Sequence, residues 1–189
     1  MVSSDYRAVF RGSIPNSICE ASARELCNLW NYIPEELAIT RDMPEDGTKD
    51  WAALSIFSCR ERQVDELNRI APITRKILSI FGNCDDSEKL QVPGVVVINF
   101  IQPNKCLPIH TDNYSGLSRV VNILGRDAIF GIIDPEIESP TYEDTVWSKT
   151  VSQGDVHEFN GGNIYPHYVK NSIYPRIVAA FTIPEDQII

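Results

Sequence analysis

Apolar residues recur at helical spacing in two segments of the first half of the chain. Asn16 is suited to cap the first helix, which ends before Pro34 and has an apolar stripe of Ile18, Ala21, Leu26, Leu29 and Trp30. Pro72 is suited to the first turn of a second helix, which Gly82 ends and whose stripe contains Ile73, Ile77, Leu78 and Phe81. We expect both helices to cover one face of a sheet.

Beyond Pro93 the pattern changes to short runs of β-branched and aromatic residues, separated by Gly, Pro, Asn and Asp. Six runs predict strands: VVVINFI, SRVVNIL, AIFGIID, TVWSKTV, DVHEF and RIVAAFTI. Their number and spacing indicate a sandwich or barrel. A mainly β chain with N-terminal helices is typical of a cupin-like double-stranded β-helix, or jelly roll, although spacing alone does not separate that roll from other sandwiches.

Two further segments lie between the predicted helices. Residues 52–58, AALSIFS, predict a strand, whereas residues 39–50, ITRDMPEDGTKD, are polar and rich in turn formers and predict a surface loop. The 189 residues contain no internal repeat, low-complexity tract or Gly/Ser linker. We therefore expect a single domain over 1–189, with a helical and mixed support region over 1–90 and the β-helix core over 91–185.

Composition limits the environment and the partners. No apolar run approaches the roughly 20 residues that span a bilayer, and the first residues lack a signal-peptide pattern, so we expect a cytoplasmic protein with no membrane partner. The net charge of -9 is spread along the chain and disfavours nucleic acid. Five cysteines without a CxxC pair are expected to be reduced, mostly buried thiols. The oligomeric state is not indicated.

The three histidines are placed informatively. His110 and Asp112 lie in LPIHTD, and residues i and i+2 of an extended chain point to the same side, so both can reach one ion. His167 follows the turn NGGNIYP, whose glycines permit the reversal that returns a second imidazole to that place. Two histidines and one carboxylate form the facial triad expected for non-haem iron(II), with coordination positions left open.

Open positions allow a 2-oxo acid cosubstrate to chelate the metal and oxygen to bind beside a target C–H bond. The far carboxylate of 2-oxoglutarate would then need a cation. Arg176, nine residues after His167 and at the start of RIVAAFTI, is suited to be that cation as a bidentate clamp inside the roll. Each residue alone is weak support for this chemistry; their order along the predicted strands carries the prediction.

The segment from about Ala71 to Pro184 resembles the iron(II)/2-oxoglutarate dioxygenases, most closely the aspartyl/asparaginyl β-hydroxylase and cis-proline hydroxylase branch. In that branch a strand and a Pro turn lead to an HxD or HxG motif, with an Arg nine positions on. Here INFIQPNKCLPIHTD followed by Arg119 has the same layout. A Gly-Asp turn, a second His and a closing Arg follow in the branch, matched by GDVHEFNGGNIYPH and YPR.

The resemblance implies that His110, Asp112 and His167 are the iron ligands and catalytic centre, and that Arg176 binds the distal carboxylate of 2-oxoglutarate. It further implies that Arg119 faces into the roll, toward substrate or cosubstrate.

Two positions depart from the pattern of the branch. Asn99 replaces a hydroxyl residue that assists the clamp, and its amide is still expected to donate a hydrogen bond to the cosubstrate; Val121 replaces a His near the cosubstrate. Because Asp112 is a carboxylate and not a small residue, the resemblance favours hydroxylation of an amino acid, an amino-acid-derived small molecule or a peptide side chain. Desaturation or ring formation would be variants of the same chemistry.

Two other functions stay open on the sequence. A cupin-type metalloenzyme without 2-oxoglutarate would use His157, in GDVHEF, as a third histidine ligand and would not need Arg176. A non-catalytic β-roll that binds a ligand or partner protein would make Arg176 and Asp112 a structural ion pair.

Overall fold

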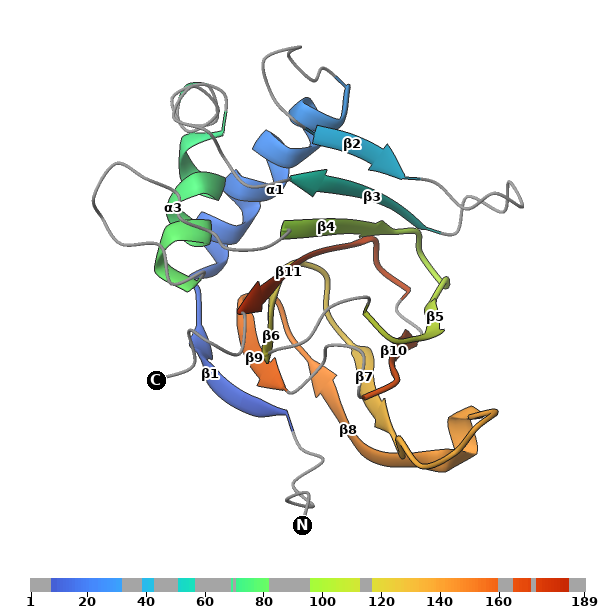
Figure 1. The fold of residues 1–189 in the computed structure, drawn as a ribbon. Coiled ribbons are helices and arrows are strands. Elements are labelled where there is room, and N and C mark those ends of the chain that lie inside the picture. Colours follow the sequence, from blue (N-terminus) through green and yellow to red (C-terminus); the bar gives the residue numbers. More distant parts are fainter. Residues whose placement is uncertain are drawn as a thin grey trace.

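The computed structural model describes the following parts of the chain: residues 8–31, 39–42, 51–56, 69, 71–81, 96–112, 117–159, 165–170 and 173–183. Within these ranges the strands form two antiparallel sheets, and helices α1 and α3 lie together on one side of them (Figure 1). No helix among these residues is both long enough and apolar enough to cross a membrane.

Helices α1 (Asn16–Asn31) and α3 (Pro72–Phe81) confirm the two predicted helices. The buried face of α1 consists of Cys19, Ser22, Ala23, Leu26 and Leu29. This face is rotated from the predicted stripe, since Ile18 is 40% exposed. The two helices are joined by polar contacts: the Glu25 carboxylate accepts hydrogen bonds from the backbone N–H groups of Ile73 (3.0 Å) and Thr74 (2.7 Å), which lie in the first turn of α3.

The larger sheet has the strand order β1-β9-β6-β11-β4-β3-β2, and the smaller sheet has the order β5-β10-β7-β8. The strands are β1 (Val9–Ser13), β2 (Ile39–Asp42), β3 (Trp51–Ile56), β4 (Val96–Ile101), β5 (Leu107–His110), β6 (Leu117–Leu124), β7 (Ala128–Ile133), β8 (Thr145–Val151), β9 (Asp155–Phe159), β10 (His167–Lys170) and β11 (Arg176–Ile183). All six runs predicted beyond Pro93 contain strands among their described residues, and β3 contains residues 52–56 of the predicted AALSIFS segment; residues 57, 58 and 95 lie outside the described ranges.

From β4 onward the chain passes back and forth between the two sheets. Strands β4, β6, β9 and β11 belong to the larger sheet, and β5, β7, β8 and β10 to the smaller one. The order β9-β6-β11-β4 facing β5-β10-β7-β8 is that of a double-stranded β-helix, so the predicted fold class is confirmed. The N-terminal strands extend the larger sheet at both edges, β1 beside β9 and β3 with β2 beside β4.

The two faces of the larger sheet are packed differently. Val121 and Val156 are directly paired on β6 and β9 and belong to a core shared with α1 and α3. Val120 of β6 and Phe159 of β9 pack instead with Phe130 of the smaller sheet. Side chains alternate along a strand. Residues in register with Val120 and Phe159 therefore point between the sheets, on what we call the inner face; those in register with Val121 lie on the helix face.

One loop prediction is wrong in part. Residues Ile39–Asp42, which begin the predicted surface loop, form strand β2 and pair with β3 over four positions. Residues 43–50 of that segment lie outside the described ranges. Turn-forming residues indicated where the chain reverses, but they did not indicate that the residues before the reversal continue the sheet.

The cysteine prediction also needs correction. Cys19 is buried, and burial together with the charge of Glu20 raises its pKa to about 11. Cys27 is exposed and Cys106 is partly exposed, so only one of the three described free thiols is buried. Cys59 and Cys84 lie outside the described residues.

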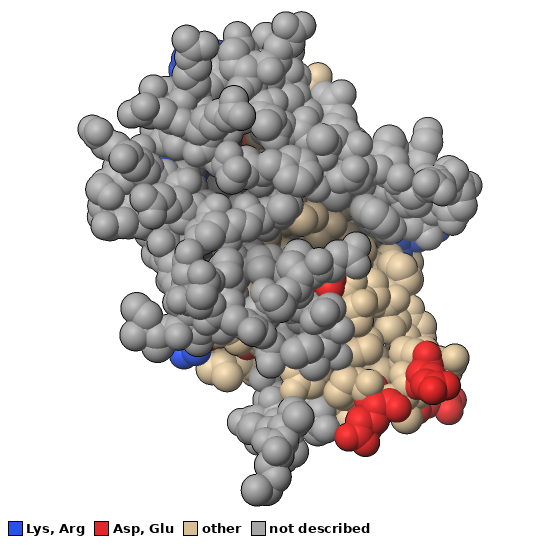
Figure 2. All heavy atoms as spheres, in the orientation of Figure 1, with Lys and Arg blue, Asp and Glu red and all other residues tan. Residues whose placement is uncertain are grey.

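The connection between β7 and β8 carries a surface concentration of negative charge. Acidic side chains gather at the lower right of Figure 2, over this connection, which includes the short helix η1 (Tyr142–Asp144). The acidic residues are Asp134, Glu136, Glu138, Glu143 and Asp144.

Candidate metal centre

Three potential metal ligands come from neighbouring strands of the smaller sheet. His110 is the last residue of β5, Asp112 follows two positions later, and His167 is the first residue of β10. β5 and β10 are antiparallel, and His110 and His167 are directly paired. His167 is also paired with Ile132 of β7, which packs in the core between the sheets. Directly paired residues share a face, so both imidazoles lie between the sheets.

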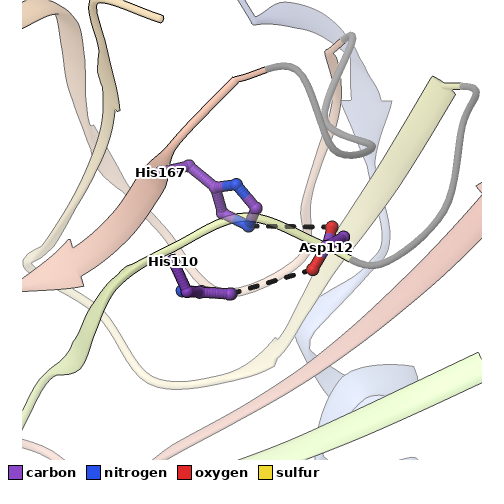
Figure 3. A group of neighbouring side chains, drawn as sticks. All are labelled: His110, Asp112 and His167. Atoms are coloured by element: carbon purple, nitrogen blue, oxygen red, sulfur yellow. Dashed lines mark ion pairs between the residues drawn. The ribbon is translucent and has the colours of Figure 1, made fainter. Parts of the chain in front are cut away.

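The three side chains converge on one space. His110 Nε2 lies 3.8 Å from Asp112 Oδ1, and His167 Nε2 lies 3.8 Å from Asp112 Oδ2 (Figure 3). One ligand atom from each residue lies within 4.8 Å of the other two. The two imidazole rings are 4.3 Å apart between centroids. The structure thus brings together the three residues that the sequence predicted as metal ligands.

The backbone selects the tautomer of both histidines. His110 Nδ1 lies 2.8 Å from the carbonyl oxygen of Pro108, and His167 Nδ1 lies 3.1 Å from that of Tyr165. A carbonyl can only accept a hydrogen bond, so each Nδ1 carries the proton and donates it. In the neutral ring the other nitrogen then has a free lone pair. Both Nε2 atoms, which face Asp112, are therefore available to a metal.

Burial keeps His167 neutral. Removal from water lowers the pKa of His167 to about 4, helped by the nearby His110 and opposed by Asp112. The ring packs against Phe159 at 5.0 Å and Phe130 at 6.2 Å between centroids, both edge-on. At neutral pH the contact with Asp112 is therefore not an ion pair of charged groups, and the ring is in the form that a metal requires.

This donor set fits a divalent cation. Two imidazole lone pairs and a carboxylate oxygen directed into one space repel one another unless a positive charge lies between them. Two nitrogen donors and one oxygen donor suit a non-haem iron(II) site with open positions. His110 has 32% of its side chain exposed, so the site is accessible from that side. The Ser118 hydroxyl also lies 3.4 Å from Asp112 Oδ2 and can donate to it.

Arg176 begins β11 and is buried, with 3% of its surface exposed. It is two positions from Val178, which is paired with Asn122 and Asn99, so its side chain leaves the sheet on the inner face. Its Nε donates to Asn122 Oδ1 at 2.8 Å. Burial lowers the pKa of Arg176 to about 9, although Asp155 acts in the opposite direction. Nη1 of the same guanidinium is buried without a hydrogen-bond partner among the described residues.

Asn122 holds the guanidinium in place. Its Nδ2 donates to the carbonyl oxygens of Gly125 (2.9 Å) and Ser152 (2.7 Å), which leaves Oδ1 to accept from Arg176. Only 2% of Asn122 is exposed. Because both Nδ2 partners are carbonyls, the amide orientation is determined. Asn122 cannot donate to a ligand; it positions Arg176 so that Nη1 stays available.

Arg119 is not where the sequence placed it. It is paired with Glu158 across β6 and β9, in register with Val121, and therefore lies on the helix face. Its Nε donates to Glu158 Oε2 at 2.9 Å, and Arg11 binds the other oxygen of the same carboxylate. Burial opposes the charge on Glu158, but the two arginines hold its pKa below the ordinary value. The expectation that Arg119 faces into the roll is wrong, because β6 presents Ser118 there instead.

The two remaining candidates lie on the inner face. Asn99 is paired with Val178 and shares the inner face with Arg176. His157 is paired with Val120 and is also on the inner face, but it does not join the metal-ligating group that the described residues form. The predicted alternative in which His157 is a third ligand is thus not seen. Nor does Arg176 form an ion pair with Asp112, which contacts the histidines.

The sequence pattern missed four contributors to the site: Asn122, Ser118 and the carbonyls of Pro108 and Tyr165. Carbonyl contacts leave no trace in residue type. Asn122 stands in a strand-forming run, SRVVNIL, where a buried amide is unusual, and that was the available signal.

Known structures share this fold. No protein-family profile and no curated protein sequence matches the chain. Among solved structures, the ribosomal oxygenase YcfD from Escherichia coli in complex with cobalt and 2-oxoglutarate has a TM-score of 0.56 at 15% identity, over 95% of this chain and 49% of that one. A prolyl hydroxylase from Trichoplax adhaerens, in complex with a hypoxia inducible factor peptide fragment, has a TM-score of 0.55 at 9% identity, over 97% and 86%.

These identities establish the fold and nothing finer. The E. coli oxygenase has also been solved with cobalt and succinic acid, where the TM-score is 0.55 at 14% identity. The present chain spans about half the length of that enzyme.

Proposed function

We propose that the chain is an iron(II)- and 2-oxoglutarate-dependent oxygenase in which His110, Asp112 and His167 hold the metal and Arg176 holds the distal carboxylate of 2-oxoglutarate. The observation that carries the proposal is the convergence of two Nε2 lone pairs and one carboxylate inside a double-stranded β-helix. Structural similarity to an oxygenase that binds cobalt with 2-oxoglutarate or succinic acid supports it.

The buried guanidinium supports 2-oxoglutarate as the cosubstrate. An arginine removed from water, with Nη1 unpaired, costs free energy that a bound carboxylate would offset by charge-assisted hydrogen bonds. The position of Asn99 on the same inner face is consistent with a second contact to this molecule.

Iron(II) in this site would supply the activation of oxygen that is coupled to loss of carbon dioxide from 2-oxoglutarate. In the overall reaction a substrate C–H bond, 2-oxoglutarate and O₂ give C–OH, succinate and CO₂. The protein's own contribution is placement. Asp112 supplies negative charge, Pro108 and Tyr165 orient the imidazoles, Phe159 and Phe130 keep water from His167, and the guanidinium orients the cosubstrate.

The exposure of the triad indicates where a substrate would bind. His110 is the accessible side of the triad, so a substrate would approach there. We propose an amino acid, an amino-acid-derived small molecule or a peptide side chain, hydroxylated as in the aspartyl/asparaginyl β-hydroxylase and cis-proline hydroxylase branch. The peptide fragment held by the similar prolyl hydroxylase supports the peptide alternative.

An isotope-labelling experiment tests the proposed function. Purified protein is incubated with iron(II), 2-oxoglutarate and ¹⁸O₂, and the succinate formed is analysed. No substrate needs to be known, because oxygenases of this class slowly convert 2-oxoglutarate to succinate without one. We expect succinate carrying one ¹⁸O atom, absent in His110→Ala. Consumption of 2-oxoglutarate that is equal in wild type and His110→Ala, or succinate without label, would exclude the proposed function.

A further inference from the structure

Two inner-face side chains of the described chain have buried nitrogen atoms without hydrogen-bond partners. One is Arg176 Nη1, and the other is His157 Nε2. His157 is 3% exposed, so its Nε2 does not reach bulk water. A buried polar atom without a partner destabilises the folded protein unless a bound ligand supplies the missing hydrogen bond. The triad does not include His157, so metal binding does not account for it.

The two nitrogens lie over the same part of the roll. β9, β6 and β11 are consecutive in the larger sheet, and His157 of β9 is paired with Val120 of β6. Two positions further along β6, Asn122 accepts from Arg176. His157 and Arg176 therefore flank β6 on the inner face, with Val120 and Asn122 as the floor between them.

The charges around His157 favour the neutral ring. Burial is the main cause that lowers the pKa of His157. The positive charges of Lys149 and Arg176 lower it further, and the negative charge of Asp155 raises it. Lys149 also lies 4.8 Å from the centre of the Phe10 ring, which contacts His157 edge-on at 5.6 Å between centroids. A neutral imidazole beside two cations can donate one hydrogen bond from Nε2, and the partner suited to that surrounding is an anion.

We propose that His157 is a second binding residue for a dicarboxylate inside the roll, with its Nε2–H donating to the same bound molecule that Arg176 holds. This inference rests on the proposed function for the identity of that molecule. The His157 inference goes beyond the proposed oxygenase function, because neither the metal triad nor Arg176 requires His157. It assigns a contact with the cosubstrate to the histidine that lies outside the metal centre.

Two variants separate a binding role from a packing role. His157→Leu removes the unpaired nitrogen, so the ligand-free protein should keep its melting temperature or gain a few degrees. A histidine that merely supports the core would lower it. His157→Gln retains an N–H donor on a side chain of similar length. Phe10→Leu is the matched control, because it alters the packing of the ring and leaves both unpaired nitrogens in place.

The probe is glutarate, a dicarboxylate without the 2-oxo group, titrated into metal-free protein and followed by ligand-observed NMR. We expect wild type to bind, His157→Leu to bind about tenfold more weakly, and His157→Gln and Phe10→Leu to stay within about threefold of wild type. Equal affinity of wild type and His157→Leu, or no glutarate binding by wild type, would overturn the proposal.

The same titration keeps this inference apart from the proposed function. If glutarate binding depends on His157 but no labelled succinate forms with iron(II) and ¹⁸O₂, the oxygenase proposal fails and the dicarboxylate site stands. If labelled succinate forms and His157→Leu binds glutarate as wild type does, the oxygenase proposal stands and His157 is not a binding residue.

Discussion

Both the nitrogen and the oxygen of the Asn122 side-chain amide are hydrogen-bonded within the protein. It donates to Gly125 and Ser152, accepts from Arg176, and so joins the ends of two turns to the cation on β11. A residue with this role is fixed by three partners, and none of them can be exchanged for water without opening the core.

Replacement of Asn122 by Ala should therefore be costly. Two carbonyls and the Nε of a buried guanidinium would lose their partners, and we expect the free energy of unfolding to fall by about 3 kcal/mol. Urea denaturation measures this. Asn28→Ala, at an exposed position of α1, is the control and should change stability by less than about 0.5 kcal/mol. A similar small effect for Asn122→Ala would contradict the assigned role.

His167 should make the metal-free protein sensitive to acid. Burial lowers the pKa of His167 from its ordinary value of 6.5 to about 4 in the folded protein, so the unfolded state binds more protons between these values. Stability should fall as the pH is lowered through this window, by on the order of 3 kcal/mol in all.

A His167→Phe variant isolates that contribution, since His157 also has a lowered pKa and acts in the same direction. Unfolding free energies of the two proteins are compared from pH 7 to pH 4. The variant should show a distinctly shallower decline. Parallel curves would mean that burial of His167 is not what makes the protein acid-sensitive.

Prediction from sequence worked best for residues whose chemistry is local. His110 and Asp112 are two positions apart, so their shared direction followed from strand geometry alone. To place Arg119, one must know which residues of β6 face the helices and which face the smaller sheet. Glu158 on the neighbouring strand holds Arg119 on the helix face. That pairing joins residues 39 positions apart, which no pattern along the chain reports.

At the scale of elements, the runs rich in β-formers were predicted as strands, whereas β1, β2, β5 and β10 were not. β5 and β10 have four residues each, and β5 contains a proline. Neither resembles a strand in isolation; each is stabilised by its neighbours in the sheet. The metal ligands on β5 and β10 were therefore predicted from the motif, and the two strands themselves were not predicted.

The turn before β9 depends on Gly154. Its φ is +88°, and a Cβ there would lie 2.2 Å from the backbone oxygen of Ile14. Gly154 also donates to the Asn122 carbonyl at 2.7 Å, so the turn joins β1, β6 and β9. Gly154→Ala should cost about 3 kcal/mol or more, because the clash is with main chain that cannot rotate away.

Gly12→Ala is the matched control for that change. Gly12 has a φ of +137° but no atom within 4 Å of an added Cβ, so only the conformational strain remains. We expect a loss of about 1 kcal/mol, measured by the same urea denaturation. Equal losses at the two glycines would mean that backbone strain, and not the contact with Ile14, governs the turn.

The whole molecule combines two cores that share one sheet. The helix-face core joins α1 and α3 to β4, β6, β9 and β11, while the inner core fills the space between the sheets. Strands from both ends of the chain enter the larger sheet, which supports the prediction of a single domain; that organisation stays a prediction. The number and spacing of the strands predicted a sandwich or barrel, but they did not separate the double-stranded β-helix from other sandwiches, because the crossing order between the sheets cannot be read from the sequence.

The central claim is a metal centre with a 2-oxo acid chelate, and one anaerobic titration tests it most directly. Iron(II) and then 2-oxoglutarate are added to the purified protein, with Asp112→Ala and Arg176→Ala alongside, and the visible spectrum is recorded. The predicted result is a weak charge-transfer band in wild type, absent in Asp112→Ala, that needs at least about tenfold more 2-oxoglutarate in Arg176→Ala. Iron binding without any band, or a band unchanged in both variants, would contradict the claim.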